Sequence, residues 1–399
     1  MSGQRVVAQV RTAVAIVGAG PAGLMLSHLL HRAGIDSVVV DIRGYQEIAT
    51  TVRAGILEPG SVRMLVDAGV SDRVLTDGDR HDGIVLRYHG DNHRIDFQEL
   101  VGESVWLYPQ TDVFLDLAAR RRADGGDVRF GVRDTAVDLA GERPRLTFTD
   151  ADGVPVCVEA DLLVGADGSR SMCRHAYPPG ARAEWFREYP FAWLGFFTEA
   201  PRSHPELVYT NSDHGFALLS HRTPTVQRMY LQCAPTDTVA DWPDERLWSE
   251  LRKRVNGNGF EVQEGPISGK AVLQFRSFVT APMRHRRLLL AGDAAHTVPP
   301  TGAKGLNLAL ADVEVLHEAI SDFLGSHDET VLDRYTERAL DRVWRAQHFS
   351  YWMTTMLHSP ADGAGFDRAR QRAELAMVSS SRSGAAYLAE GYTGWQHLK

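Results

Sequence analysis

The stretch that decides the fold is Val14-Ala15-Ile16-Val17-Gly18-Ala19-Gly20-Pro21-Ala22-Gly23, in which a short apolar run ends in a glycine-rich turn. Residues 24–33 follow with apolar side chains at helical spacing, and a second apolar run, 37–40, ends on Asp41. This order of strand, turn, helix and strand predicts a βαβ unit, which is the building block of open parallel sheets.

Each glycine of the turn has a predicted purpose. Gly18 permits the tight turn, Gly20 lets the backbone approach a pyrophosphate, and Gly23 lets the helix lie close to the strand. The helix N-terminus supplies unpaired N–H groups, and Asp41 stands where an acid accepts from a ribose hydroxyl. We therefore predict a dinucleotide site, with a structural turn as the alternative. The motif alone does not distinguish FAD from NAD.

The composition is that of a globular protein without a general affinity for nucleic acid. Its 399 residues suffice for two or three lobes, and a net charge of -8 gives no attraction to polyanions. Cys157, Cys173 and Cys233 are an odd number without CxxC spacing, so we expect neither a disulfide framework nor a metal site. No run reaches the roughly 20 apolar residues of a membrane span, and we expect a cytoplasmic protein.

Two later segments place an acidic residue after an apolar run. Residues 161–164 lead into Gly165-Ala166-Asp167-Gly168, and 287–290 lead into Ala291-Gly292-Asp293-Ala294. A carboxylate at the C-terminal end of a parallel strand lies in the crevice where such sheets bind ligands, and it can accept from a ribityl chain. Taken singly, either acid could equally belong to a turn or a helix N-cap.

Together these three segments resemble the signatures of the single-component FAD-dependent aromatic hydroxylases. The run 289–307 and the segment 209–230 resemble, more narrowly, the 4-hydroxybenzoate 3-monooxygenases of that family, and the likeness extends from about residue 12 to Tyr392. The resemblance implies an α/β fold with three parts. They are a Rossmann-like FAD-binding domain (1–180 and 281–325), a mainly β substrate-binding domain (181–280) and a C-terminal helical region (326–399).

The resemblance also implies a reaction. FAD, reduced by NADH or NADPH, would react with O2 and, through a C4a-hydroperoxide, hydroxylate 4-hydroxybenzoate to 3,4-dihydroxybenzoate. 4-Aminobenzoate and 3,4-dihydroxybenzoate stay open as substrates, because the expected anchor reads only the carboxylate and the para substituent. The rival classes are a flavin or NAD dehydrogenase, which would not need Tyr209, Tyr392 and His81, and an inactive ligand sensor, which would not need the two acidic signatures.

Residues 207–234 read as a β meander of three strands. Alternation places Ser220 and Arg222 on one face of the middle strand. An arginine in a pocket binds a carboxylate through two parallel bonds, and the resemblance implies that Arg222 does so with Ser220 and Tyr230 as added donors. By itself, Arg222 reads as a surface residue of a strand.

A proton relay is implied by the same resemblance. Tyr209 would bind the phenol oxygen of the substrate and favour the phenolate, Tyr392 would come next, and His81 would form the solvent end. A free tyrosine has a pKa of about 10 and a free histidine about 6.5, so His81 is the natural group to exchange protons with water. Without the resemblance, Tyr392 and His81 read as surface residues.

The glycine-rich run 299–305 predicts a loop that opens a helix over 306–320. Its N–H groups and the helix dipole can stabilise a negatively charged reduced flavin, and a simple helix cap is the alternative. The resemblance places Pro300, as a catalytic residue, and Thr301 beside flavin and substrate. The predicted FAD contacts are Gly18, Gly20, Gly23, Asp41, Arg53, Gln110, Asp167, Arg228, Asp293, Lys304, Gly305, Leu306 and Asn307. In the family, Arg53 matches a pyrophosphate contact and Arg228 a residue that governs flavin movement.

The prediction for the nicotinamide rests on positions at which this sequence differs from NADPH-using relatives. Glu47 and Thr51 stand where NADPH-using relatives have a tyrosine and an arginine, and an acid repels a 2′-phosphate. We therefore expect NADH to serve as well as or better than NADPH. Arg43 and Arg170 keep the question open, because either can reach a phosphate.

Residues 328–357 carry apolar side chains at helical intervals and predict a long amphipathic helix. The aromatic side chains on it, Trp344, Phe349, Tyr351 and Trp352, read either as interior packing or as a dimer surface. The resemblance implies a homodimer.

Overall fold

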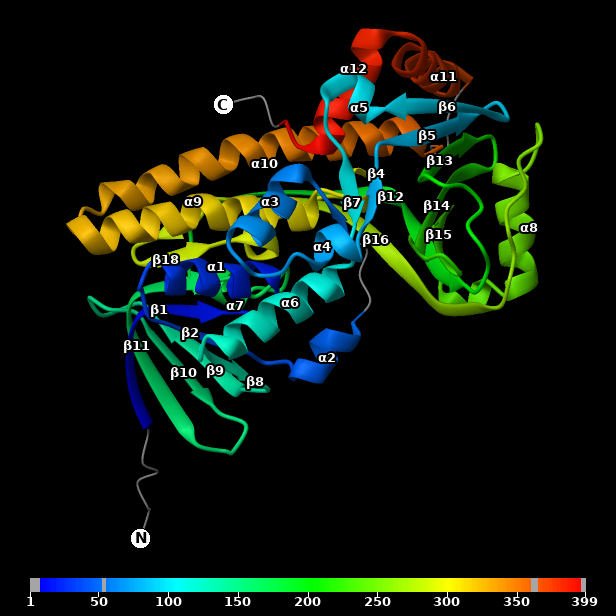
Figure 1. Ribbon diagram of the computed structural model, residues 1–399. Coiled ribbons are helices and arrows are strands. Elements are labelled where there is room, and N and C mark those ends of the chain that lie inside the picture. The colour runs from blue at the N-terminus through cyan, green and yellow to red at the C-terminus, as the bar shows by residue number, and fades with distance from the viewer. Residues whose placement is uncertain (1–7, 52–54, 360–364, 396–399) are drawn as a thin grey trace.

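The computed structural model describes residues 8–51, 55–359 and 365–395. Figure 1 shows two large sheets on opposite sides of the molecule. One sheet is largely parallel and carries the dinucleotide turn, the other is largely antiparallel, and long helices run between them. The predicted α/β class is therefore confirmed. The predicted Arg53 lies outside the described residues.

The first sheet is built around strand β1 (Ala8–Val17). The strand order is β17 (Arg284–His285), β18 (Leu288–Leu290), β11 (Pro155–Gly165), β1, β2 (Ser37–Asp41) and β8 (Asp127–Phe130), and β10 (Arg145–Thr149) and β9 (Arg133–Asp138) join through β11. Strands β18, β11, β1, β2 and β8 pair in parallel, so their carboxyl ends lie at one edge. Val14, Ala15 and Ile16 are fully buried, as a central parallel strand covered on both faces requires.

β1 begins six residues before the predicted apolar run. Residues 8–11 alternate between half-buried and exposed side chains, so no apolar run marks them. They form a strand because Ala8 to Thr12 pair with Val156 to Ala160 of β11. The helix α1 (Pro21–Arg32) starts at the proline of the turn, where the missing N–H and fixed φ are tolerated.

The second sheet contains the predicted meander. Its order is β19 (His296–Thr297), β16 (Ile267–Ala281), β12 (Ala183–Thr198), β15 (Val226–Cys233), β14 (Gly215–Thr223), β13 (Val208–Ser212), β5 (Gly83–Tyr88) and β6 (Asp91–Asp96). Strands β13, β14 and β15 are antiparallel neighbours, as predicted. Strands β5 and β6 come from the segment predicted as the first FAD-binding part, and they join here because β5 pairs with β13. The domain limits stay predictions.

Alternation gives the meander two different faces. Val208, Leu219 and Leu231 pack in the core under helix α8 (Asp244–Val255). Tyr209 and Leu218 face the other core, which is shared with the C-terminal helices. This face of the sheet is therefore covered by α10 (Thr330–Leu357), α11 (Gly365–Ser380) and α12 (Arg382–Thr393). Figure 1 shows α11 and α12 beside β5 and β6, and α10 running alongside α9.

The remaining elements connect the two sheets. A small sheet has the order β3 (Ile56–Leu57), β7 (Val105–Leu107) and β4 (Asp79–His81). Helix α9 (Gly305–Ser326) packs on α1 and α10, and α6 (Gln110–Ala123) packs on α1. Short elements complete the described chain: α2 (Tyr45–Thr50), α3 (Pro59–Asp67), α4 (Arg73–Thr76), α5 (Phe97–Val101), α7 (Met172–His175), η1 (Val239–Asp241), η2 (Gly292–Ala294) and η3 (Pro300–Gly302). Within the described ranges, no helix has the length and apolarity needed to cross a membrane.

Candidate active site

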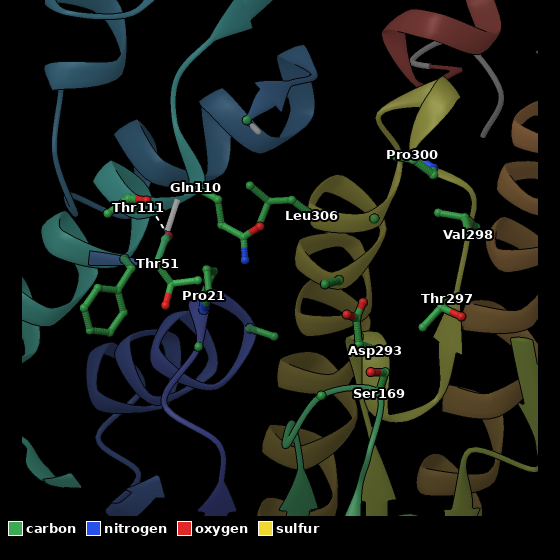
Figure 2. A pocket seen from close by; sticks show the side chains of 18 of the residues that line it. Pro21, Thr51, Gln110, Thr111, Ser169, Asp293, Thr297, Val298, Pro300 and Leu306 are labelled. Carbon is green, nitrogen blue, oxygen red and sulfur yellow. Dashed lines mark hydrogen bonds between the residues drawn. The ribbon is translucent and has the colours of Figure 1, made fainter. Parts of the chain in front are cut away.

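A cavity of about 980 Å³ is lined by residues from both large sheets. In Figure 2, Pro21 and Gln110 stand on one side of it, opposite Asp293 and Leu306. The predicted site residues in its wall are Gly18, Gly20, Asp41, Arg43, Gln110, Asp167, Arg170, Tyr209, Ser220, Arg222, Arg228, Tyr230, Asp293, Pro300, Lys304, Gly305 and Leu306. Those that are not part of the wall are Gly23, Glu47, His81, Thr301, Asn307 and Tyr392.

The glycine turn has the geometry that was predicted for it. Gly18 has φ +110°, and a Cβ on it would lie 2.1 Å from the Ala166 carbonyl oxygen. A Cβ on Gly23 would lie 1.9 Å from the Gly18 carbonyl oxygen, whereas one on Gly20 would meet nothing within 4 Å. Gly18 and Gly23 are thus required by packing, and Gly20 leaves the backbone at the N-terminus of α1 open to the cavity.

Asp41 fastens the turn and also binds its own neighbour. Its carboxylate accepts from Ala19 N at 2.9 Å, and from the Arg43 side chain at 3.1 Å through Nε and 2.9 Å through Nη2. The hydrogen bond to Asp41 raises the pKa of Arg43. A ribose hydroxyl at Asp41 would therefore share the carboxylate with Arg43 or displace it.

The two predicted acidic residues, Asp167 and Asp293, differ in the contacts of their turns. Asp167 accepts from Ser171 Oγ at 2.5 Å and from Cys173 N at 3.0 Å, so it holds the start of α7, which is the local role that the sequence left open. The turn that carries Asp293 is held by Asp312, which accepts from Gly292 N at 2.8 Å. Asp312 was missed by the sequence analysis, because its contacts appear only when α9 packs against this turn.

Buried side-chain hydrogen bonds hold the loop before α9 in place. Lys304 is buried and donates to Glu58 Oε1 at 2.7 Å and to the Tyr392 carbonyl at 2.9 Å, and burial lowers the pKa of this lysine. Asn307 accepts from Glu58 N at 2.9 Å, and Thr301 accepts from Thr354 Oγ1 at 2.9 Å. Thr301 and Asn307 thus use their side chains to hold the loop and are not part of the cavity wall, and their place beside flavin and substrate stays a prediction.

Arg228 provides the clearest sign of a missing acceptor. Its Nη1 is buried and has no hydrogen-bond partner among the described residues, while its guanidinium lies over the rings of Phe197 and Tyr230. A buried guanidinium N–H without an acceptor costs about 1–3 kcal/mol or more. Arg228 lines the cavity, so a bound group with an oxygen or nitrogen acceptor would satisfy it. The residues present thus fit the flavin that the fold accommodates.

The part of the cavity around Arg222 combines positive side chains with apolar walls. Arg222 is half-buried there, where burial lowers its pKa and the nearby Asp112 carboxylate opposes this shift. The Trp193 ring forms part of the wall and is fixed by a hydrogen bond from its Nε1 to His358 Nε2 at 2.7 Å. Ser220 donates to the Arg228 carbonyl at 2.7 Å, so its proton is used within the sheet. This end suits a flat apolar ligand with one negative group.

Tyr209 and Tyr392 form a buried hydroxyl pair. Their oxygens are 2.6 Å apart, and each side chain is only 1% exposed. Burial raises the pKa of both phenols, which are therefore neutral at neutral pH. The pair can pass a proton from the cavity towards α12 while neither tyrosine carries a lasting charge.

His81 is not at the surface, contrary to the predicted solvent end of the relay. Its side chain is 2% exposed, and its Nε2 lies 3.3 Å from Nε2 of His221. Burial, and then the neighbouring His221, lower the pKa of His81 to about 4. No local pattern predicts this contact, because His81 lies on β4 of the small sheet and His221 on β14 of the second large sheet, and only the packing of the two sheets brings them together.

The three residues predicted for the nicotinamide site differ in their contacts. Arg170 lines the cavity, Arg43 is paired with Asp41, and Glu47 is exposed on α2. Arg276 of β16, which the sequence analysis did not single out, lines the same cavity and donates to Ser169 Oγ at 2.9 Å.

Known proteins resemble this chain over most of its length. The FAD binding domain family matches residues 11–350. The p-hydroxybenzoate hydroxylase of Acinetobacter baylyi is 41% identical over 386 residues, which are 96% of this chain and 95% of that protein. A probable NADH-specific resorcinol 4-hydroxylase of Rhodococcus jostii is 27% identical and spans 81% of this chain and 61% of that protein.

Solved structures share the fold at lower identity. The crystal structure of p-nitrophenol 4-monooxygenase from Pseudomonas putida superposes with a TM-score of 0.81 at 18% identity, covering 98% of this chain and 100% of that one. A complex of aklavinone-11 hydroxylase with FAD and aklavinone gives a TM-score of 0.74 at 21% identity over 88% of this chain and 70% of that one.

Proposed function

The chain belongs to the FAD-binding monooxygenase family, and we propose that it hydroxylates 4-hydroxybenzoate to 3,4-dihydroxybenzoate with NADH or NADPH and O2. It is an FAD-dependent aromatic monooxygenase. The choice of substrate is supported by one observation. Arg222, which is positively charged, and Tyr209, which has a phenol, line a single cavity that continues to the glycine turn. A 4-hydroxybenzoate anion offers a carboxylate and a para hydroxyl to match them.

Substrate binding follows from these two groups. Arg222 binds the carboxylate through parallel charge-assisted bonds, and this fixes which end of the ring faces Tyr209. The apolar side chains Trp193, Leu218 and Leu273 line the ring and keep water from the reacting carbon. FAD, when bound, supplies electrons taken from the nicotinamide and activates O2.

Tyr209 controls the ionisation of the substrate. Its hydroxyl accepts the phenol proton of the substrate as its own proton moves to Tyr392, across the 2.6 Å contact between the two oxygens. The substrate is left as a phenolate, whose ring carbons ortho to the oxygen are electron-rich. No charge accumulates on Tyr209, which matters because burial raises its pKa.

The cofactor contacts are proposed from the cavity wall. Gly18, Gly20 and the N-terminus of α1 would hold the pyrophosphate, and Asp293 would accept from the ribityl chain. Arg228 offers its unpaired Nη1 to the flavin. Lys304 contributes indirectly, because its ion pair with Glu58 holds the loop against the strand β3 segment.

We propose that NADH serves as well as or better than NADPH. Glu47 lies close enough to Arg43 to raise its pKa, and Arg43 is already paired with Asp41. A 2′-phosphate approaching this segment would meet two carboxylates, one of them exposed. The name of the Rhodococcus jostii relative, an NADH-specific hydroxylase, points the same way.

We propose that the protein is a homodimer through an exposed aromatic surface. Trp185, Phe186, Trp344 and Tyr351 are 47%, 60%, 44% and 39% exposed and line a groove of about 280 Å³ between β12, β16 and α10. Phe349, in contrast, is 1% exposed, so it belongs to the interior packing that the sequence left as an alternative. A cytoplasmic location also stays a proposal, supported by three free cysteines.

The proposed reaction is tested by mixing the FAD-loaded protein with NADH in the absence of O2, with and without 4-hydroxybenzoate, and then admitting air. We expect the substrate to speed flavin bleaching and the product to be 3,4-dihydroxybenzoate. Benzoate is the matched control, because it has the carboxylate and lacks the hydroxyl. Bleaching that ignores 4-hydroxybenzoate, or equals that with benzoate, would show that the substrate is another aromatic acid.

A further inference from the structure

Three titratable side chains meet beside the substrate strand. β4 supplies Asp79 and His81, and β14 supplies His221, which stands between Ser220 and Arg222 in the sequence. Nε2 of His221 is 3.3 Å from Nε2 of His81 and 2.5 Å from Oδ2 of Asp79. The imidazoles of His81 and His221 are 2% and 3% exposed, whereas the Asp79 side chain is 34% exposed. The cluster therefore leads from the interior to water.

The hydrogen bonding of the cluster makes one atom its centre. Nδ1 of His81 is buried and has no partner among the described residues, so it is the nitrogen that can take up a proton from the interior, while Nε2 faces His221 and releases one. Nε2 of His221 faces both neighbours, and it can accept a proton from His81 and then donate it to Asp79. Asp79 itself lies 3.8 Å from His81, which is too far for a direct hydrogen bond.

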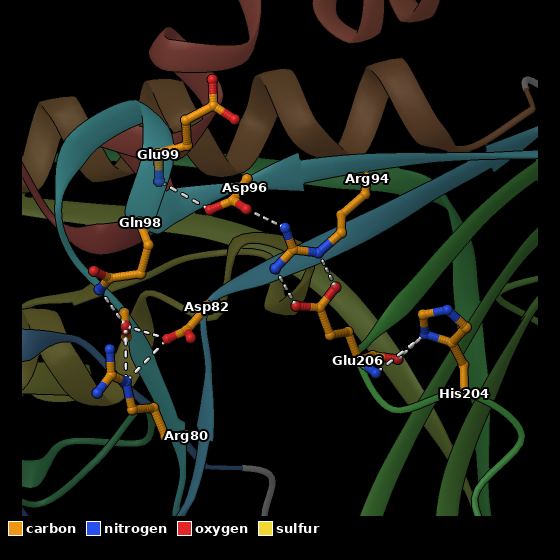
Figure 3. A network of polar contacts seen from close by, with 9 residues as sticks. Arg80, Asp82, Arg94, Asp96, Gln98, Glu99, His204 and Glu206 are labelled. Carbon is orange, nitrogen blue, oxygen red and sulfur yellow. Dashed lines mark hydrogen bonds and ion pairs between the residues drawn. The ribbon is translucent and has the colours of Figure 1, made fainter.

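The surroundings of the cluster keep both imidazoles neutral, so they transfer a proton and do not hold it. Burial, and then the charge of Arg202, lower the pKa of His221, while Asp79 opposes this shift. Arg202 Nη2 lies 2.6 Å from Oδ2 of Asp79. Glu206 acts in the opposite sense on His81 but is held by Arg94 at 2.8 Å, as Figure 3 shows. Neither imidazole retains a proton at neutral pH, so a proton that arrives from inside is passed on.

We propose that His221 and Asp79 are the outer steps of the proton path that begins at Tyr209. The link from Tyr209 through Tyr392 to His81 is the one that the resemblance implies, and the cluster adds two steps to it. Nε2 of His81 donates the proton to Nε2 of His221, and the proton then leaves from Asp79 to water. Nothing is oxidised or reduced in these steps, and each group returns to its starting protonation state. The inference rests on the proposed function, and it moves the solvent end of the relay from His81 to Asp79.

The same three ligand atoms are close enough to hold a metal ion, and among the described side chains they form such a set. Two histidines and one carboxylate are a common zinc ligand set. The guanidinium of Arg202 already occupies the carboxylate oxygen that a metal would need, and its charge repels a second cation. We therefore favour proton transfer, and metal binding is an outcome of the test.

The test measures proton release when 4-hydroxybenzoate binds to the FAD-loaded enzyme, by stopped flow with a pH indicator in weak buffer. In His221→Gln and Asp79→Asn, we expect release to slow by about tenfold or more, while the Kd of the substrate stays within about twofold. Added imidazole should restore the rate in His221→Gln, which a structural role would not predict. Asp82→Asn is the matched control, because this exposed carboxylate lies next to His81 in sequence but binds Arg80 and Ser104, as Figure 3 shows for Arg80.

Two results would overturn the proposal. One is wild-type release rates in both variants, and the other is slow release that imidazole does not relieve. Binding of one equivalent of Zn²⁺ by the wild type but not by His221→Gln, with unchanged proton release, would assign the cluster to a metal. Failure of the proposed function looks different, since the wild type itself would then release no proton with 4-hydroxybenzoate and would form no 3,4-dihydroxybenzoate.

Discussion

Replacing Tyr392 by Phe removes one hydroxyl from a fully packed position. The ring would keep its contacts with Phe97 and Phe349, whose centroids lie 5.2 Å and 6.4 Å away. The lost interaction is the 2.6 Å bond to the Tyr209 hydroxyl, and a buried hydroxyl left unpaired costs about 1–3 kcal/mol. With an unfolding entropy of about 2.1 cal/mol/K per residue over this chain, the melting temperature should fall by only about 1–4 °C.

The effect of Tyr392→Phe on catalysis should be much larger than its effect on stability. Without Tyr392, Tyr209 has no group to take its proton, so the bound substrate stays a phenol and its ring is less reactive. We expect kcat to fall by about 10²–10⁴-fold, with KM little changed because Arg222 still holds the carboxylate. The remaining rate should rise with pH, since the phenol must then ionise without the relay.

The assay measures two quantities between about pH 6 and pH 9. They are the rate of 3,4-dihydroxybenzoate formation and the phenolate absorbance of the bound substrate. Tyr387→Phe is the matched control on the same helix, because its hydroxyl pairs with His348 at 2.8 Å and is away from the relay. Tyr209→Phe/Tyr392→Phe should be no slower than either single variant, since both act in one path. If Tyr392→Phe keeps kcat within about twofold and still ionises the substrate, the reasoning is refuted.

Four further outcomes are expected. Lys304→Met should lower the free energy of unfolding by about 1–3 kcal/mol, because the buried Glu58 carboxylate loses one of its two cationic partners and keeps only Arg342, and Lys304→Met/Glu58→Gln should recover much of it in denaturant titrations; an equal loss in both would contradict this. Arg222→Lys should raise KM for 4-hydroxybenzoate by about tenfold or more, since a lysine lacks the bidentate fork; an unchanged KM would place the carboxylate elsewhere. Glu47→Arg should raise kcat/KM for NADPH relative to NADH by about tenfold, and no change would remove Glu47 from the nicotinamide site. Trp344→Glu should convert the dimer to a monomer in analytical ultracentrifugation, whereas a persistent dimer would put the interface on another surface.

Local sequence patterns determined the parts of the site that are built from neighbouring residues. The glycine turn could be predicted because its three glycines, the strand before it and the helix after it are consecutive in the chain. The meander was predicted for the same reason, and alternation alone put Ser220 and Arg222 on one face. Such patterns report the backbone geometry of a few adjacent residues, which depends little on the rest of the protein.

Only the tertiary structure decided which distant groups share a contact. Lys304 and Glu58 are 246 residues apart, and His81 and His221 are 140 apart, so no local pattern relates either pair. The resemblance placed Thr301 and Asn307 beside flavin and substrate, and only the folded chain shows that their side chains pair with Thr354 and with the Ile56 carbonyl. Burial depends on where whole sheets and helices come to lie, and this is why the sequence identified the chemistry of the site while the fold determined its proton exit.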